Sequence, residues 1–170
     1  MGSKLHYATF RTNMGWVGVL GSSQGLLATT LPQSSAQKAR LQLGDGVTYA
    51  SWSPDSFKDV INRLSGYFYG ADVSFPDKLD LSQAAPFQRQ VWEITRHIPY
   101  GETRSYGWVA EQLGKPEALR AVGQALSKNP LPIIIPCHRV IATNGRVGGF
   151  SGGTEMKRRL LSLEASGKRH

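Results

Sequence analysis

The hydrophobic pattern of this chain changes its period after about residue 32, and that change limits the folds open to it. Before residue 32 the apolar residues form three short stretches, at residues 5–11, 16–20 and 25–31, separated by Asn13 and by the turn residues 21–23. Short apolar stretches divided by turn residues predict a β-meander or a pair of hairpins. Farther along the chain the apolar residues recur at helical spacing instead. The sequence therefore predicts a small sheet followed by helices.

Residues 71–85 show little regular pattern and mark the expected domain boundary. Upstream of it, residues 53–68 predict a helix that begins at a Ser-Pro N-cap, and residues 33–46 are ambiguous but compatible with another helix. We therefore expect an α/β domain at residues 1–80 and a mainly helical domain at residues 86–170. With 170 residues the chain is long enough to bury a sizeable core.

Three helices are predicted in the first part of the second domain. The first begins at Pro86 and ends near residue 98. Ser105 is placed to cap the second helix, which ends near Gly114, and the third covers residues 117–127. Two helices joined by about four residues that include a glycine predict a helix-turn-helix. Such hairpins bind DNA in some proteins and only pack against each other in others.

The positive charge of the chain is concentrated in its second half. The formal net charge is +8; residues 1–85 carry 7 basic and 6 acidic side chains, whereas residues 86–170 carry 13 and 6. A basic domain is typical of proteins that meet a polyanion, most often nucleic acid. A solvated basic surface is the alternative interpretation.

The chain has a single cysteine, Cys137. One thiol excludes an internal disulfide and a zinc site of several thiolates, so the fold needs no oxidising compartment. No stretch approaches the roughly 20 apolar residues of a membrane span, and no charged-then-apolar leader opens the chain. We therefore expect no membrane partner and a cytoplasmic protein, or a nuclear one if the source is eukaryotic.

The neighbours of Cys137 favour chemistry over packing. The apolar residues 133–135 predict a buried strand that ends at Pro-Cys-His-Arg. Ionisable groups are costly to bury unpaired, and an imidazole oriented by a carboxylate increases the thiolate fraction of a cysteine. His138 is the candidate base, acting from beyond the strand or through a water. The residues alone leave the orienting acid open among Glu155, Glu164 and more distant carboxylates.

Residues 133–141, IIIPCHRVI, resemble the active-site strand of the O6-alkylguanine-DNA alkyltransferases, which remove alkyl groups from guanine O6. Further motifs of that family follow in its order. They are YGETRSY at 100–106, RAVG at 120–123 with NP at 129–130, GGFSGG at 148–153 and LLSLE at 160–164. The resemblance covers roughly residues 86–165. It implies a ribonuclease-H-like α/β N-terminal domain and a winged-helix-like C-terminal domain with a helix-turn-helix.

The resemblance assigns the chemistry to five residues. Cys137 accepts the alkyl group irreversibly in a single turnover, His138 takes the thiol proton through a water, and Glu164 pairs with His138. Asn129 stabilises the turn that joins the DNA-reading helix to the active site. Tyr106 lies over the extruded nucleotide and donates a proton to the departing guanine. No cofactor and no metal are implied.

The implied partner is double-stranded DNA containing O6-alkylguanine, with O4-alkylthymine as a second substrate, bound through its minor groove by a monomer. Arg120 fills the space of the extruded base, and Ser151 donates a hydrogen bond to the O6 atom. Taking the nucleotide out of the duplex costs a few kcal/mol, which such contacts offset. The other expected DNA contacts are Ser105, Ala118 and Gly123, and the other expected pocket residues are Trp108, Val140, Gly149 and Phe150.

Simpler roles and rival functions stay open at this point. Tyr106 can be a core aromatic, Arg120 a phosphate contact and Ser151 a loop cap. Phe150 stands where many relatives of the family have tyrosine, which removes one hydroxyl from the pocket. Some members bind zinc in the N-terminal domain, where this chain offers only His6, so that site is expected to be absent. The rivals are a sensor of alkylated DNA, a Cys-His hydrolase and a transcription regulator.

Overall fold

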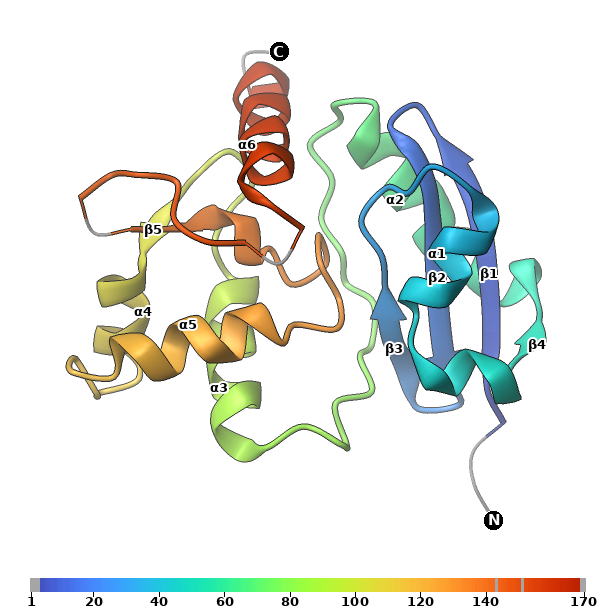
Figure 1. Cartoon of the computed structure of the whole chain (residues 1–170), viewed down its shortest axis with the longest axis horizontal. Helices are drawn as coiled ribbons and strands as arrows, with labels where there is room; N and C mark the ends of the chain where they lie inside the picture. The colour runs from blue at the N-terminus through green and yellow to red at the C-terminus, as the bar shows by residue number, and fades with distance from the viewer. Residues whose placement is uncertain (1–3, 143, 151, 169–170) are drawn as a thin grey trace. The chain divides into compact units, whose positions relative to one another are not determined.

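A computed structural model describes residues 4–142, 144–150 and 152–168. The chain forms two compact units, one that ends at Gln83 and one that begins at Ala84 (Figure 1). In the described part of the chain, no helix has the length and apolar character needed to cross a membrane.

The first unit is built on a four-stranded sheet in the order β3-β2-β1-β4. The strands are β1 (His6–Thr12), β2 (Gly15–Ser22), β3 (Gly25–Thr29) and β4 (Ser51–Trp52). The first three strands pair antiparallel, with Phe10 opposite Val17, and the short β4 pairs parallel with β1. This pairing confirms the meander predicted from the three apolar stretches. Short loops can join neighbouring strands only when the strands run antiparallel.

The helices of the first unit are α1 (Ala36–Gln42), the 3₁₀ turns η1 (Asp45–Tyr49) and η2 (Pro54–Phe57), and α2 (Lys58–Phe68). The ambiguous region thus contains α1, whose N-cap Ser35 accepts a hydrogen bond from Lys38 N. A core of Leu20, Ala28, Leu43 and Val47 joins the sheet to α1 and η1. At Gly18 a Cβ would lie 3.0 Å from Ala39 O, so glycine is what lets α1 approach β2 closely.

The expected helix at residues 53–68 begins differently from the prediction. A 3₁₀ turn, η2, precedes α2, and Ser53 makes no side-chain cap. Its hydroxyl oxygen instead lies 2.6 Å from Ser56 Oγ. Because the Ser53 hydroxyl contacts Ser56, it does not accept a hydrogen bond from the backbone N–H groups at the start of η2.

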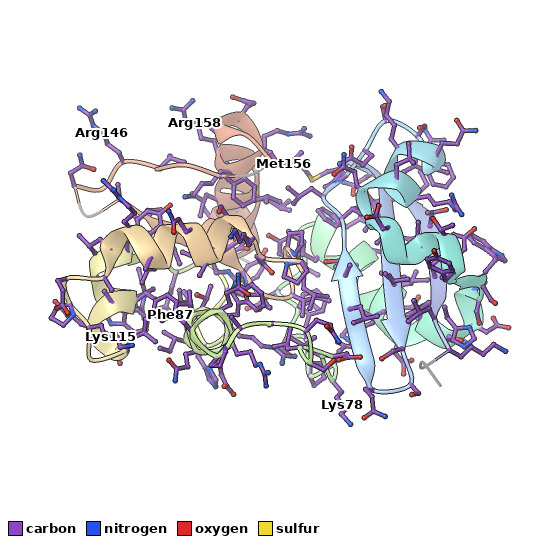
Figure 2. The ribbon with its side chains drawn as sticks, turned by 60° about the horizontal axis from the view of Figure 1, so that its bottom comes forward. Lys78, Phe87, Lys115, Arg146, Met156 and Arg158 are labelled. Carbon is purple, nitrogen blue, oxygen red and sulfur yellow. The ribbon has the colours of Figure 1, made fainter. Side chains whose placement is uncertain are left out.

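The second unit is mainly helical. Its elements are α3 (Pro86–Arg96), β5 (Arg104–Ser105), α4 (Tyr106–Gln112), α5 (Leu119–Ser127), the 3₁₀ turn η3 (Cys137–Arg139), β6 (Val140–Ile141) and α6 (Thr154–Lys168). Helix α3 is held to α5 by a hydrogen bond from Trp92 Nε1 to Ala125 O at 2.8 Å. Figure 2 shows Phe87 and Lys115 close together, and the Lys115 ammonium lies 5.4 Å from the Phe87 ring centroid.

Helices α4 and α5 form the predicted helix-turn-helix. Ser105 Oγ accepts a hydrogen bond from Trp108 N at 2.9 Å, and Gly114 has the left-handed φ of 73° expected after a helix. Helix α5 begins at Leu119, two residues later than predicted. The preceding residues form a turn instead, closed by Ala118 N donating to Lys115 O at 2.9 Å.

The predicted buried strand at residues 133–135 is wrong. The segment is a compact turn with Ile133 at φ 76°, bridged between Pro132 and Ile135. Three prolines, at positions 130, 132 and 136, lack the N–H groups that a strand in the middle of a sheet needs. The segment is buried because it underlies Cys137, and its apolar composition alone resembles a strand.

A two-residue parallel pairing of β5 with β6 places the cysteine beside the helix-turn-helix. Arg104 pairs with Val140, and Ser105 pairs with Ile141. The turn η3 leads directly into β6, and β5 leads directly into α4, whose first residue is Tyr106. Residues 36 positions apart in the chain therefore meet at one place.

Candidate active site

Cys137 lies at the edge of a cavity of about 690 Å³ in the second unit. The described residues around this cavity come from α4, α5, η3 and the following loop; they are Tyr106, Leu119, Arg120, Gly123, Leu126, Ser127, Cys137, Ala142, Gly149 and Phe150. Cys137 itself is only 6% exposed. A thiol in this position meets a ligand in the cavity and little bulk water.

Asn129 holds the segment that carries the thiol. Its Nδ2 donates to Ile135 O at 2.8 Å and contacts Cys137 Sγ at 3.1 Å, and its Oδ1 accepts from Leu131 N at 2.8 Å. The amide thus replaces the sheet hydrogen bonds that the prolines prevent. It also provides a donor to the sulfur, which favours the thiolate.

His138 and Glu164 form the expected pair. His138 Nε2 lies 2.5 Å from Glu164 Oε2, and both side chains are almost fully buried. Because Glu164 engages Nε2, Nδ1 is the ring nitrogen able to receive a proton from the thiol side. Of the acids left open by the residues, Glu155 is exposed on α6, and Glu164 makes the contact.

Arg139 completes a network that the sequence interpretation did not include. Its Nε donates to Glu164 Oε1 at 2.8 Å, its Nη2 to Glu164 Oε2 at 3.1 Å, and its Nη1 to Ile98 O at 2.7 Å. Gly101 N donates a further hydrogen bond to Glu164 Oε1 at 3.0 Å. The carboxylate therefore has a hydrogen-bond partner on each oxygen, as a buried charge requires.

The electrostatics of the pair follow from burial and from these contacts. Burial acts to raise the pKa of Glu164, but the hydrogen bonds from His138 and Arg139 and the charge of Arg139 outweigh it and lower the pKa to about 2. Burial lowers the pKa of His138, although Glu164 opposes that shift. At neutral pH the network is therefore a carboxylate beside a neutral imidazole, the state that can accept a proton.

Lys157 is a second functional candidate that the sequence interpretation missed. It is fully buried, its Nζ donates to Gly149 O at 3.1 Å, and it lies 5.7 Å from the Tyr106 ring centroid. Burial lowers the pKa of Lys157 to about 8, against the opposing charge of Cys137. Its helical spacing was the available signal, because residues 157, 160 and 164 share one face of α6.

Cys137 is not a resting thiolate. Burial raises its pKa, and the Asn129 hydrogen bond and the Lys157 charge only partly oppose that shift. Tyr106 shows the same trend, since burial and the nearby Cys137 raise its pKa, and its hydroxyl donates to Gly149 O at 3.3 Å. The site thus holds a protonated thiol, a protonated tyrosine and a neutral base.

The structure brings together most of the predicted site residues. Arg120, Gly123, Gly149 and Phe150 line the cavity with Tyr106 and Cys137, and Arg120 is exposed. Val140 is buried next to the cysteine turn without lining the cavity. The predicted DNA contacts Ser105 and Ala118 cap α4 and precede α5.

Besides Val140, two further predicted pocket residues are not seen at the cavity. Trp108 does not line it, and its ring lies 5.5 Å from the Arg104 guanidinium carbon. Ser151 lies outside the described residues. Within the described part of the chain, no group of three His, Cys, Asp or Glu side chains is arranged to hold a metal ion.

Comparisons with known proteins agree over most of the chain. The sequence model described as "6-O-methylguanine DNA methyltransferase, DNA binding domain" matches residues 86–166. The methylated-DNA–protein-cysteine methyltransferase of Mycobacterium tuberculosis is 39% identical over 164 residues, 95% of this chain and 93% of that protein. The protein of the same name from Methanosarcina acetivorans is 38% identical over 95% of this chain and 99% of its own length.

Solved structures give the same result. The crystal structure of Mycobacterium tuberculosis OGT in complex with DNA matches with a TM-score of 0.81 and 40% identity, over 95% of this chain and 94% of that one. The O6-methylguanine-DNA methyltransferase of Pyrococcus kodakaraensis strain KOD1 matches with a TM-score of 0.69 and 30% identity, over 94% and 98%. The chain with the buried Cys137, His138 and Glu164 therefore belongs to the methylated-DNA–protein-cysteine methyltransferase family.

Proposed function

We propose that this chain repairs O6-alkylguanine in double-stranded DNA by moving the alkyl group irreversibly to Cys137, once per molecule. O4-alkylthymine is the second substrate, because it also carries its alkyl group on an exocyclic ring oxygen. The observation that carries the proposal is the position of the Cys137 thiol, which lines a cavity of about 690 Å³. The next residue, His138, forms a buried imidazole-carboxylate pair with Glu164 of α6.

The transfer combines one displacement with removal of the thiol proton and protonation of the departing base. The Cys137 proton passes to His138 Nδ1 through a water, and the sulfur attacks the alkyl carbon while the bond from that carbon to the guanine oxygen breaks. The electron pair of that bond stays on the guanine, which is then protonated. Tyr106 donates that proton, and the proton held by His138 restores the tyrosine through solvent. In the net reaction the alkyl group moves to the sulfur and one proton moves to the guanine, so the products are a thioether and an unmodified guanine.

Tyr106 supplies the proton at the leaving group. Its raised pKa keeps the hydroxyl protonated at neutral pH, and it lies on the same cavity as the sulfur. A positioned donor stabilises the negative charge that develops on the departing base. A second hydrogen bond, to the guanine O6 atom, is assigned to Ser151 because residues 148–153 resemble the pocket loop of the family.

Recognition of the duplex is assigned to α5 and Arg120. The alkylated carbon cannot reach a buried thiol while its base is stacked, so the nucleotide has to be extruded. Arg120 is exposed at the start of α5 and lines the cavity, which suits it to occupy the gap left in the duplex. The small residues Ala118 and Gly123 leave room for the DNA backbone, and a Cβ at Gly123 would meet nothing within 4 Å.

The finer fold assignments belong to the same proposal. The first unit is assigned a ribonuclease-H-like arrangement on the basis of its mixed sheet and helices, and the second a winged-helix-like one on the basis of α4 and α5. A monomer suffices, because one chain carries the thiol, the base, the acid and the helix-turn-helix.

The test is a mass measurement on the whole chain. After incubation with duplex DNA that contains one O6-methylguanine, we expect one added methyl group per chain, located on Cys137 by peptide mapping. The control is Cys137→Ser with the same DNA, which should gain no mass.

Other outcomes would identify the rival functions. Binding to the damaged duplex without any adduct would contradict the transferase and favour a sensor of alkylated DNA. Repair of more than one equivalent of DNA per chain would contradict the single turnover and favour a hydrolase.

A further inference from the structure

The loop that borders the cavity carries one basic residue, Arg146, at a fixed place. Ala142 N donates to Arg146 O at 2.9 Å, and Gly145 N donates to Ala142 O at 2.9 Å, which closes a tight turn. Gly145 has a φ of 83°, a conformation that favours glycine, and Asn144 Oδ1 accepts a hydrogen bond from Arg146 N at 3.1 Å. Arg146 therefore follows directly after a turn whose first residue, Ala142, lines the cavity.

The far side of the same loop is anchored to both neighbouring helices. Lys157 of α6 and Tyr106 of α4 both donate hydrogen bonds to Gly149 O. At Gly148, with φ of 77°, a Cβ would lie 3.2 Å from the Tyr106 ring, so the backbone approaches α4 as closely as a glycine permits. The chain between Ala142 and Gly149 thus begins and ends at the cavity, and Arg146 lies between these two points.

The charge of Arg146 is available to a ligand. Its side chain is exposed, and among the described residues no carboxylate lies within ion-pair distance of it. Residues 142–150 contain no acidic side chain. Figure 2 shows Arg146 at the outer end of its loop with its side chain directed away from the fold, as is that of Arg158 on α6.

One exposed guanidinium, that of Arg120, lines the cavity, and a second, that of Arg146, belongs to the loop that supplies lining residues but does not itself line the cavity. Arg120 comes from α5, and Arg146 comes from the loop on which Gly149 and Phe150 also lie. A nucleotide that enters the cavity stays attached to its strand through a phosphate on each side. Those phosphates have to pass over the rim of the cavity, where a forked, permanently charged donor suits them.

We propose that Arg146 binds a backbone phosphate of the strand that carries the alkylated base, so that the loop is a DNA-binding element in addition to the helix-turn-helix. This inference rests on the proposed function, because that function defines which DNA strand carries the alkylated base. The contact is to phosphate and not to a base edge, so it contributes equally on damaged and undamaged DNA.

The test compares Arg146→Gln, Arg146→Lys and the unchanged chain in binding to an undamaged and an O6-methylguanine duplex over a range of KCl concentrations. For Arg146→Gln we expect roughly ten-fold weaker binding to both duplexes. The slope of log K against log [KCl] should decrease in magnitude by about 0.9, because one fewer phosphate is neutralised. Arg146→Lys should retain the slope. The control is Arg89→Gln, an exposed arginine on α3 that does not line the cavity.

A second measurement separates this contact from a structural role of the loop. Arg146→Gln should react with free O6-alkylguanine base at the unchanged rate, since the base alone has no phosphate. An unchanged salt slope, or an equal loss of reaction with the free base, would overturn the inference. If instead the unchanged chain gains no methyl group, the proposed function fails, while the slopes on undamaged DNA still decide whether Arg146 contacts phosphate.

Discussion

Among the described residues of the second unit, His138, Arg139, Lys157 and Glu164 are buried side chains of the charged or histidine type. Glu164 and Arg139 neutralise each other, His138 remains neutral, and Lys157 uses a backbone carbonyl and the face of Tyr106. Burial of isolated charges would cost several kcal/mol each. The contacts of these groups offset that cost. Buried ionisable groups gathered around one thiol are typical of reactive sites.

Lys157 is expected to assist formation of the thiolate. Lys157→Met removes a positive charge that acts to lower the pKa of Cys137, so alkyl transfer should be roughly ten-fold slower at pH 7, the effect of about one pKa unit. The difference should shrink above pH 8, because the unchanged lysine, with its pKa lowered to about 8, then loses its own charge. The measurement is the single-turnover rate as a function of pH.

The matched control for this variant is Arg159→Met, an exposed residue of the same helix, which should follow the unchanged chain at every pH. A rate ratio for Lys157→Met that does not vary with pH would show that Lys157 only anchors Gly149.

At the scale of elements, local sequence determines the helix-turn-helix, whereas a tertiary contact determines the conformation of the segment before the cysteine. The helix-turn-helix was predictable because α4 has an N-cap serine and is followed by a left-handed glycine, and because both helices have apolar residues at helical spacing. The turn at residues 131–135 was mistaken for a strand because its conformation depends on the Asn129 side chain, a contact that no periodicity reports. Proline spacing was the local signal against a strand.

Helix α5 should contribute to repair of duplex DNA but not to the chemistry. If Arg120 occupies the gap left by the extruded base, Arg120→Ala should slow repair of duplex DNA on the order of 100-fold, because flipping costs a few kcal/mol. Reaction with free O6-alkylguanine should be almost unchanged. Gln124→Ala, an exposed residue of the same helix, is the control. Equal losses on both substrates would contradict the role.

At the scale of the whole molecule, the two units differ in charge and in the chemistry that they carry. The excess of positive charge belongs to the unit that holds the thiol, the helix-turn-helix and the exposed Arg120 and Arg146. Long-range attraction thus brings a polyanion to the unit that acts on it. If Cys137 accepts the alkyl group, as we propose, the single cysteine limits the molecule to one transfer.

The buried Glu164 makes the stability of the protein depend on pH. Its pKa is lowered to about 2 in the folded chain, so its contribution is complete above its usual value of 4.5 and is lost as the pH falls toward 2. Urea unfolding should show a loss of about 2 kcal/mol from this group between pH 5 and pH 3. In Glu164→Gln that loss should be absent, and stability at pH 7 should already be about 3 kcal/mol lower.

Glu155→Gln provides the comparison for this experiment, because Glu155 is exposed on the same helix and should leave the pH dependence unchanged. The neutral His138 also contributes to acid destabilisation in all three proteins. In Glu164→Gln the carboxylate no longer opposes the lowering of the His138 pKa, so this contribution extends to lower pH there. An identical decrease for Glu164→Gln and the unchanged chain would show that Glu164 is not the group responsible.

The sequence by itself determined the local features of this protein: the meander, the helix-turn-helix, the basic second half, and Cys137 beside His138. Each depends on residues close together in the chain. Only the tertiary structure decided which acid orients the histidine, that Arg139 and Lys157 join the site, and that Trp108 does not line the cavity. Those contacts join α6, η3 and the loop at residues 142–150. Their partners are chosen by packing and by the need to pair buried charges, which local sequence patterns do not encode.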